Sequence, residues 1–279
     1  MTTDALGDRM KMYESSETGR RFMPMLPVYA RIDGRNFSRF TEGMDRPYDQ
    51  KLADCMTETT RRLMKETAAL AGYTQSDEIS LLFHAPDPKS DLFFDGKIFK
   101  MVSVTAALTT SIFTALARAH WPDRIDRSPL SFDCRAFQLP TKDEAANAFL
   151  WRELDATKNA VSMAARCHFS HRELLGKSGP EMQEMMFQKA AVNFNDFPTR
   201  FKRGVFLVKR MGLKEIDPEA LARIPEQYRP DGPVERPVIA ELDMPRFGTV
   251  TNRVEVLFEG ADPITESQTG TGEQDKSRG

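Results

Sequence analysis

Apolar residues in the first half of the chain fall into segments whose spacing predicts strands and helices. Residues 25–32 form an apolar run, and residues 130–139 alternate, with Phe132 on one side and Asp133 on the other. Alternation is typical of a half-buried strand, whereas apolar positions three or four residues apart indicate a helix. The predicted order is strand, helix, strand, strand, helix, strand, over residues 25–32, 48–70, 73–75, 79–84, 99–120 and 130–139.

This order is that of a ferredoxin-like domain (βαββαβ), so the predicted fold class is α+β. In such a sheet the first and third strands are antiparallel neighbours. The end of the first strand therefore lies beside the start of the third. Asp33 follows the first strand, and Asp77 and Glu78 precede the third. The topology thus predicts that these three acids lie close together.

The second half of the chain is predicted to be helical and then mixed. Trp151 falls in the middle of a predicted helix, where we interpret it as a core side chain rather than a base-stacking one. A short strand follows, then a loop rich in proline and charge, and then a closing hairpin. The predicted helices are 142–167 and 181–192, the strand is 205–208, the loop is 214–233, and the hairpin joins 238–242 to 250–258.

Composition also divides the chain into regions. The polar start, residues 1–22, is either an irregular arm or a short helix, and the polar, glycine-rich end is predicted to be disordered. Apolar segments are confined to the residues between them. The predicted organisation is an N-terminal arm (1–24), the βαββαβ domain (25–140), a helical and mixed C-terminal region packed on that domain (141–260), and a disordered tail (261–279).

The paired acids at the strand ends suit magnesium better than they suit a packed core. Mg²⁺ takes one or two carboxylates together with phosphate oxygens, and two such ions stabilise the attacking and leaving oxygens of a displacement. Asp33 and Asp77 are candidate bridging ligands, and the Gly34 carbonyl is a further oxygen. Each motif alone also fits an ordinary turn. Their joint placement by the topology favours the metal site.

The residues that follow Asp33 suit a triphosphate. Gly34 lets the backbone come close to a ligand, and the amides of residues 35–40 can cradle phosphates, as turn amides do elsewhere. Arg46 can neutralise phosphate charge.

Charge and composition restrict the remaining possibilities. The net charge is −2, so nucleic-acid contact needs a local basic patch. Residues 200–210 are the densest basic segment and fit either an RNA-phosphate site or a solvated strand edge. Three scattered cysteines argue against disulfides and a zinc site. With no apolar run of about 18 residues and no signal-peptide pattern, we expect no membrane segment and a cytoplasmic protein.

Three motifs resemble those of the tRNA(His) guanylyltransferase family, whose members add nucleotides to RNA 5′ ends in the 3′-5′ direction. The resemblance covers most of residues 25–210. The first and third motifs, taken together, are specific to this family. Later matches at residues 132–135, 151–155 and 202–204 support them. The motifs are Arg31-Ile32-Asp33-Gly34-Arg35-Asn36-Phe37, Arg46-Pro47-Tyr48-Asp49 and Tyr73-Thr74-Gln75-Ser76-Asp77-Glu78-Ile79-Ser80.

The resemblance implies a polymerase palm at residues 25–140, with Asp33, Asp77 and Glu78 as catalytic acids. Two Mg²⁺ ions would be held by Asp33, Gly34 and Asp77. The implied partners are tRNA and GTP, ATP or other NTPs, in a homo-oligomer (dimer or tetramer). The resemblance gives as triphosphate-binding Gly34, Arg35, Asn36, Phe37, Ser38, Arg39, Phe40, Arg46 and Ser76, and as RNA-binding Arg135, Arg152, Lys158, Asn159, Lys202 and Arg203.

The chain also departs from the family pattern. The run Thr157-Lys158-Asn159-Ala160 stands where strict guanine-adding members have His-x-Asn-Asn, and Tyr48 stands where the family usually has Asn. These departures resemble bacterial, archaeal or phage-like relatives, which repair truncated tRNA 5′ ends by templated addition.

Two other functions remain open from the sequence. A palm-fold nucleotide cyclase or second-messenger synthase would use the same acids on an NTP alone, but the basic segment and the second-half resemblance count against it. A non-catalytic RNA-binding palm module would have no need of Asp33, Asp77 and Glu78, because buried acids repel one another without a metal.

Overall fold

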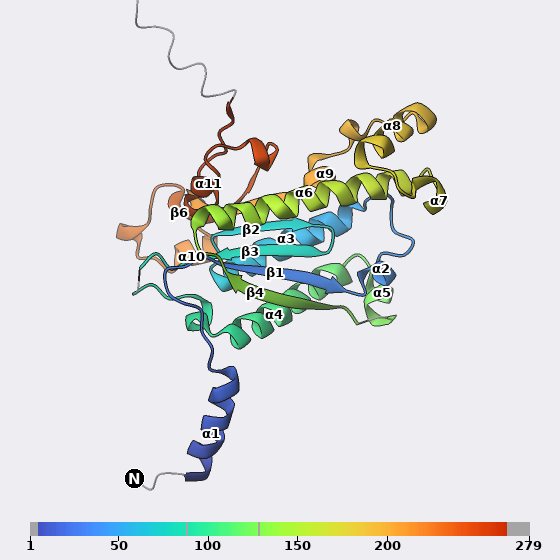
Figure 1. The fold of residues 1–279 in the computed structure, drawn as a ribbon. Helices are drawn as coiled ribbons and strands as arrows, with labels where there is room; N and C mark the ends of the chain where they lie inside the picture. Colours follow the sequence, from blue (N-terminus) through green and yellow to red (C-terminus); the bar gives the residue numbers. More distant parts are fainter. Residues whose placement is uncertain (1–4, 88, 128, 267–279) are drawn as a thin grey trace, which may run out of the picture.

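Six strands form one antiparallel sheet in the order β4-β1-β3-β2-β5-β6 (Figure 1). The computed structural model describes residues 5–87, 89–127 and 129–266. The first four strands follow the predicted βαββαβ order, and β1 pairs with β3 as predicted. The strands are β1 (Val28–Arg35), β2 (Ala71–Gln75), β3 (Glu78–Phe83), β4 (Ser131–Gln138), β5 (Val205–Lys214) and β6 (Val234–Leu242).

Helices cover both faces of the sheet (Figure 1). Alternation along β1 sends Val28, Ala30 and Ile32 into the core under α3 (Gln50–Thr67) and α4 (Ile98–Arg118). Tyr29 points the other way, into a second core under α6 (Lys142–Arg166). These three helices confirm the predicted helices at 48–70, 99–120 and 142–167.

Side-chain caps define where two of these helices begin. The Asp49 carboxylate accepts a hydrogen bond from the Leu52 N–H at 3.0 Å, and Thr141 accepts one from the Glu144 N–H at 3.1 Å. The cap at Asp49 matters for the site, because it fixes the loop that leads into α3. The remaining α-helices are α1 (Ala5–Thr18), α2 (Phe37–Phe40), α5 (Pro122–Arg127), α7 (His171–Leu174), α8 (Gly179–Ala190), α9 (Thr199–Arg203), α10 (Pro218–Ala222) and α11 (Arg253–Glu259).

The predicted closing hairpin between 238–242 and 250–258 is wrong. β6 pairs instead with β5, in a register from Phe206↔Leu242 to Lys214↔Val234, and most of 250–258 is the helix α11. A short apolar run fits a strand or a buried helix equally well. In α11 Val256 and Leu257 are buried, and Gly260 ends the helix with a φ of 74°.

The two ends of the chain differ in how they join the body of the protein. Helix α1 has no buried residue and projects away from the sheet (Figure 1). Of the two alternatives for the N-terminal arm, the short helix is therefore confirmed. At the other end, Ile264 exchanges hydrogen bonds with Thr251 and Asn252. Residues 261–266 of the predicted disordered tail are therefore bonded to the body, and 267–279 lie outside the described residues.

Among the described residues, α4 is long and apolar enough to cross a membrane by length and composition alone. The expectation of no membrane segment depended on the lack of an unbroken apolar run of about 18 residues, and α4 meets the looser test of length and average composition. Threonines and alanines between the larger apolar residues keep the whole helix apolar without forming an unbroken run. In the fold, α4 buries Met101, Phe113 and Ala117 within the core that it shares with α3.

Candidate active site

The ends of β1 and β3 bring the predicted acids together. Asp33 of β1 pairs in register with Glu78 of β3 on one side and with Asp133 of β4 on the other. Residues directly opposite in an antiparallel pair share a face of the sheet, so these three carboxylates form one row. The Gly34 N–H donates to the Asp77 carbonyl at 3.1 Å, which joins the β2–β3 turn to the end of β1.

Within this group, Glu78 has its charge balanced by two arginines. Its carboxylate forms ion pairs with Arg31 through one oxygen and with Arg152 through the other. Arg152 also pairs with Asp155 at 3.0 Å, and its side chain is buried. Charge-assisted hydrogen bonds of this kind hold a carboxylate in one position. The Glu78 carboxylate is therefore held in place beside Asp33.

Asp33 and Asp77 are not balanced in this way. Arg135 approaches Asp33 only to 4.0 Å, and within the described residues Asp77 has no ion pair. Burial, together with the negative charge of Asp33, raises the pKa of Asp77 to about 6. Burial and the charge of Glu78 also raise the pKa of Asp33. Carboxylates whose charged forms are disfavoured by burial and by each other provide a place for a cation.

This donor set fits magnesium. Mg²⁺ is usually held by one or two carboxylates, and its other ligands are phosphate oxygens and waters. Asp33 and Asp77 are the carboxylates that could hold such an ion, and the Gly34 carbonyl is the adjacent backbone oxygen. Within the part of the chain that the structure describes, no group of three or more His, Cys, Asp or Glu side chains is placed to hold a metal. A substrate phosphate would therefore have to complete the coordination.

Gly34 is required by close packing at the end of β1. A Cβ at this position would lie 2.3 Å from the Phe37 ring and 3.0 Å from the Asp77 Cβ. Both distances are too short for non-bonded carbons, so a side chain here would push the loop away from Asp77. The glycine thus keeps Asp33, Asp77 and the following loop together.

The loop after Gly34 presents its backbone and anchors itself with two aromatic rings. Asn36 adopts a left-handed conformation (φ 58°) and leads into α2, whose first N–H groups have no intrahelical acceptor. Phe37 and Phe40 are buried, and both rings pack on Phe113 at 5.2 and 5.9 Å. The side chains of Arg35, Ser38 and Arg39 remain exposed.

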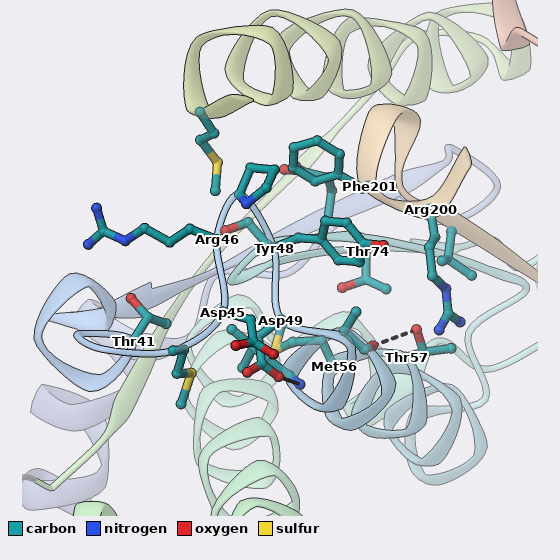
Figure 2. Close-up of a pocket in the computed structure, with 18 of the residues that line it drawn as sticks. Thr41, Asp45, Arg46, Tyr48, Asp49, Met56, Thr57, Thr74, Arg200 and Phe201 are labelled. Carbon is teal, nitrogen blue, oxygen red and sulfur yellow. Dashed lines mark hydrogen bonds between the residues drawn. The ribbon is translucent and has the colours of Figure 1, made fainter. Parts of the chain in front are cut away.

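A cavity of about 390 Å³ reaches the turn between β2 and β3, and Figure 2 shows residues that line it. Ser38 and Ser76 line it, and these residues are neighbours of the loop and of Asp77. The rings of Tyr48 and Phe201 stack with centroids 5.0 Å apart, and the Arg46 side chain extends away from them (Figure 2). The other lining residues come from the loop before α3, from α3, β2, the C-terminal half of α6, α9 and the start of β5.

The basic residues predicted to bind RNA are divided by the fold. Arg152 is buried against Glu78, as described above. Lys202 donates to the Asn195 carbonyl, and Arg203 donates to the Met244 carbonyl. Residues 199–203 are the helix α9, and residues 205–208 of β5 are paired with β2 on one side while 206–214 are paired with β6 on the other. The prediction of residues 200–210 as a solvated strand edge is therefore wrong. Arg135, Lys158 and Asn159 remain exposed.

Trp151 is not a core residue, which corrects the sequence-based interpretation. Its side chain is 49% exposed, and the guanidinium groups of Arg152 and Arg31 lie 4.6 and 5.7 Å from its ring centroid. Helical spacing places Asn147, Trp151, Leu154 and Lys158 along one exposed stripe of α6. The polar ends of that stripe were the signal that the indole faces outward.

Two contributions to the site were missed from the sequence. Arg31 stands two residues before Asp33, and side chains two apart on a strand share a face, so its pairing with Glu78 was open to prediction. Tyr48 was noted only as a departure from the family pattern. Its stacking partner, Phe201, lies more than 150 residues away in the sequence, and no local pattern joins the two.

Comparisons with known proteins agree with this geometry. Residues 7–140 match the family model described as tRNAHis guanylyltransferase. A bacterial tRNA(His) guanylyltransferase-like protein solved in complex with ATP is 37% identical, with a TM-score of 0.69 over 73% of this chain and 88% of that one. A bacterial tRNA(His) guanylyltransferase-like protein in complex with GTP is 30% identical, with a TM-score of 0.68 over 88% and 94%.

A tRNA(His) guanylyltransferase of Neurospora crassa is 28% identical over 225 residues, which are 74% of this chain and 73% of the relative. Because the bacterial structures match at 30% identity or more and nearly their whole length is covered, they extend the likeness well past residue 140. The chain belongs to the tRNA(His) guanylyltransferase family.

Proposed function

We propose that the protein is a Mg²⁺-dependent nucleotidyltransferase that adds nucleotides to the 5′ end of tRNA in the 3′-5′ direction. The observation that carries the proposal is the pair Asp33 and Asp77, half-buried and without close cationic partners, next to Ser76, which lines a cavity large enough for a nucleoside. Family membership supports the reaction class. The nucleotide added is GTP, or the NTP that pairs with a template base.

The roles of the acids follow from their surroundings. Asp33, Asp77 and the Gly34 carbonyl would hold two Mg²⁺ ions, whose charge would neutralise the phosphates and stabilise the attacking and leaving oxygens. Glu78 keeps the row in position, because Arg31 and Arg152 fix its carboxylate. Asp133, which is 53% exposed and pairs with Arg135 at 3.3 Å, lies at the open end of the row.

The loop and the cavity bind the nucleotide. The backbone amides of residues 35–40 cradle the triphosphate, while Arg35, Arg39 and Arg46 balance its charge. Phe37 and Phe40 contribute through the backbone that their buried rings hold in place. Ser76 lines the cavity next to Asp77, so the nucleoside lies on the α3 side of the acids.

The reaction then has two forms. A 5′-monophosphate end attacks the α-phosphate of ATP, releases pyrophosphate and becomes adenylated. The 3′-hydroxyl of the incoming nucleotide attacks the 5′ phosphorus, a phosphodiester forms, and AMP leaves. A 5′-triphosphate end needs no activation and releases pyrophosphate. Arg135, Lys158 and Asn159 are the exposed candidates for contact with the tRNA. We also propose a cytoplasmic location and a homo-oligomeric state, on the family resemblance.

A 5′-extension assay tests the proposal. Purified protein, Mg²⁺, ATP and all four NTPs are incubated with complete tRNA, with tRNA lacking its first 5′ nucleotide, and with intact tRNA(His). We expect extension of the truncated tRNA by the pairing base. Addition of G to intact tRNA(His) would point to the guanylylating activity instead. No extension, together with a cyclic product from NTP alone, would refute the proposal in favour of a cyclase.

A further inference from the structure

An exposed aromatic surface lies next to the acid row, on the part of the sheet that α6 leaves uncovered. Trp151 of α6 and Phe137 of β4 are 49% and 39% exposed. On the same face of the sheet, Arg135 pairs in register with Arg31, and Phe137 pairs with Tyr29. We call Trp151, Phe137 and Arg135 the β4 platform.

The β4 platform is linked to the acids by a short chain of contacts. The Arg31 guanidinium lies 5.7 Å from the Trp151 ring and pairs with Glu78, which stands opposite Asp33. Arg152 lies over the same ring and pairs with the other oxygen of Glu78. The indole is therefore held in one orientation, and an aromatic ring fixed in advance binds a base with less loss of entropy.

The nucleotide cavity lies on the other side of the acids. Met163 and Arg166 of α6 line that cavity, and Trp151 precedes Met163 by twelve residues, about 18 Å along the helix axis. Ser76, next to Asp77, lines the cavity, whereas Glu78 faces the side of Trp151. The cavity and the β4 platform therefore lie at different places along α6, which leaves the β4 platform free for the second reactant.

We propose that the β4 platform receives the end of the RNA acceptor stem, with the terminal base pair stacked on Trp151. This inference rests on the proposed function, because it names where the RNA substrate of that reaction lies. Stacking on an aromatic ring tolerates any base, which suits a surface that must accept different terminal pairs. Arg135 stands beside it for the phosphate backbone. The nearby carboxylates of Asp155 and Asp133 already pair with Arg152 and Arg135.

Tryptophan fluorescence tests this placement without catalysis. The chain contains only two tryptophans, so a Trp121→Phe variant leaves Trp151 as the single emitter. We would titrate this variant, without NTP or Mg²⁺, with an RNA hairpin that has a free 5′-monophosphate end and with a closed RNA dumbbell of the same stem. We expect the hairpin to quench about half of the emission and the dumbbell to bind with little quenching.

Kinetics give the second measurement. Trp151→Ala should raise KM for truncated tRNA about tenfold, the range expected from loss of one stacked base, with KM for NTP unchanged, while Trp151→Phe should stay close to wild type. Phe187→Ala, which removes an exposed aromatic side chain from α8, is the matched control and should leave both constants unchanged.

Equal quenching by the dumbbell, or RNA binding without quenching, would overturn the proposal. Emission that changes with protein concentration and not with RNA would assign the surface to contact with a second copy. If the protein adds no nucleotide but the hairpin still quenches Trp151 selectively, the proposed reaction fails and the RNA-end site stands.

Discussion

Two acidic regions lie near α6, one buried and one half-buried, and they differ in what balances their charge. Near the middle of the helix, both oxygens of Glu153 accept from the Phe247 N–H, at 3.1 and 3.0 Å, and Arg203 lies 3.7 Å away. At the ends of β1 and β3, Arg135 approaches Asp33 only to 4.0 Å, and among the described residues Asp77 has no ion pair. A carboxylate satisfied within the chain stabilises the fold, whereas one left unbalanced is available to a cation from outside.

Glu78 stands between these two cases and sharpens the comparison. It belongs to the acid row by position, yet its charge is balanced by Arg31 and Arg152. Position on the sheet is therefore not enough to identify a metal ligand. The number of cations that already face the carboxylate decides between a structural and a metal-binding role.

The largest effect is expected at Asp77. Asp77→Asn removes a metal ligand and should lower the rate of 5′ addition by ~10³-fold, because metal stabilisation of the transferring phosphoryl group is worth several kcal/mol. Its melting temperature without Mg²⁺ should not fall, since the buried charge is lost as well. Extension assays and thermal unfolding check both results. Asp87→Asn, which changes an exposed loop carboxylate, is the control. If Asp77→Asn were nearly as active as this control, Asp77 would not be a metal ligand.

The next effect is expected at Gly34. A methyl group would lie 2.3 Å from the Phe37 ring, so Gly34→Ala should displace the loop by several tenths of an ångström or more. Misplacement of this order costs about 10²-fold in rate, and overpacking costs about 1–3 kcal/mol in stability. Urea unfolding and the extension assay measure the two losses. Gly248→Ala, where the nearest side-chain atom would be 3.5 Å away, is the matched control and should change neither.

The sequence predicted that Asp33 and Glu78 lie side by side, because their placement depends on topology. Once residues 25–139 are read as βαββαβ, the antiparallel pairing of the first and third strands brings Asp33 beside Glu78. The same reasoning could not predict the ion pair between Arg152 and Glu78, because that pair depends on where α6 crosses the sheet. The outward face of Trp151 depends on that crossing too.

The prediction of a C-terminal hairpin was wrong for a different reason. Residues 250–258 carry too few apolar positions to separate a period of 2 from one of 3.6. Their helical state is fixed by tertiary contacts, in which Val256 and Leu257 join the core under α6. The cavity was also beyond prediction in detail, because Tyr48 and Phe201 meet only through the packing of α9 on α6.

A stability effect is expected at Glu153, on the balanced side of the comparison. Glu153→Ala leaves the Phe247 N–H unsatisfied and Arg203 without its carboxylate. A buried donor left without its acceptor costs about 1–3 kcal/mol. Glu153→Gln keeps an acceptor for Phe247 and should cost about 1 kcal/mol or less. Urea unfolding measures both, and equal losses in the two variants would mean that the charge, and not the hydrogen bond, is what the fold needs.

The smallest expected effect is on how the stability of the fold depends on pH. Stability changes in the same direction with pH in both regions, but Mg²⁺ should alter the change only at Asp77. The pKa of Asp77 is raised from its ordinary value of 3.8 to about 6, so the stability linked to its protonated form is complete below pH 3.8 and is lost as pH rises through 6. Burial also raises the pKa of Glu153, which gives a loss in the same direction.

With EDTA present, the urea midpoint of the wild type should therefore fall between pH 5 and pH 8. Asp77→Asn should fall less, and Mg²⁺ should reduce the fall in the wild type only. If Mg²⁺ reduced the slope equally in both proteins, the cation would bind away from Asp77, and the contrast between a balanced and an unbalanced carboxylate would not explain the site.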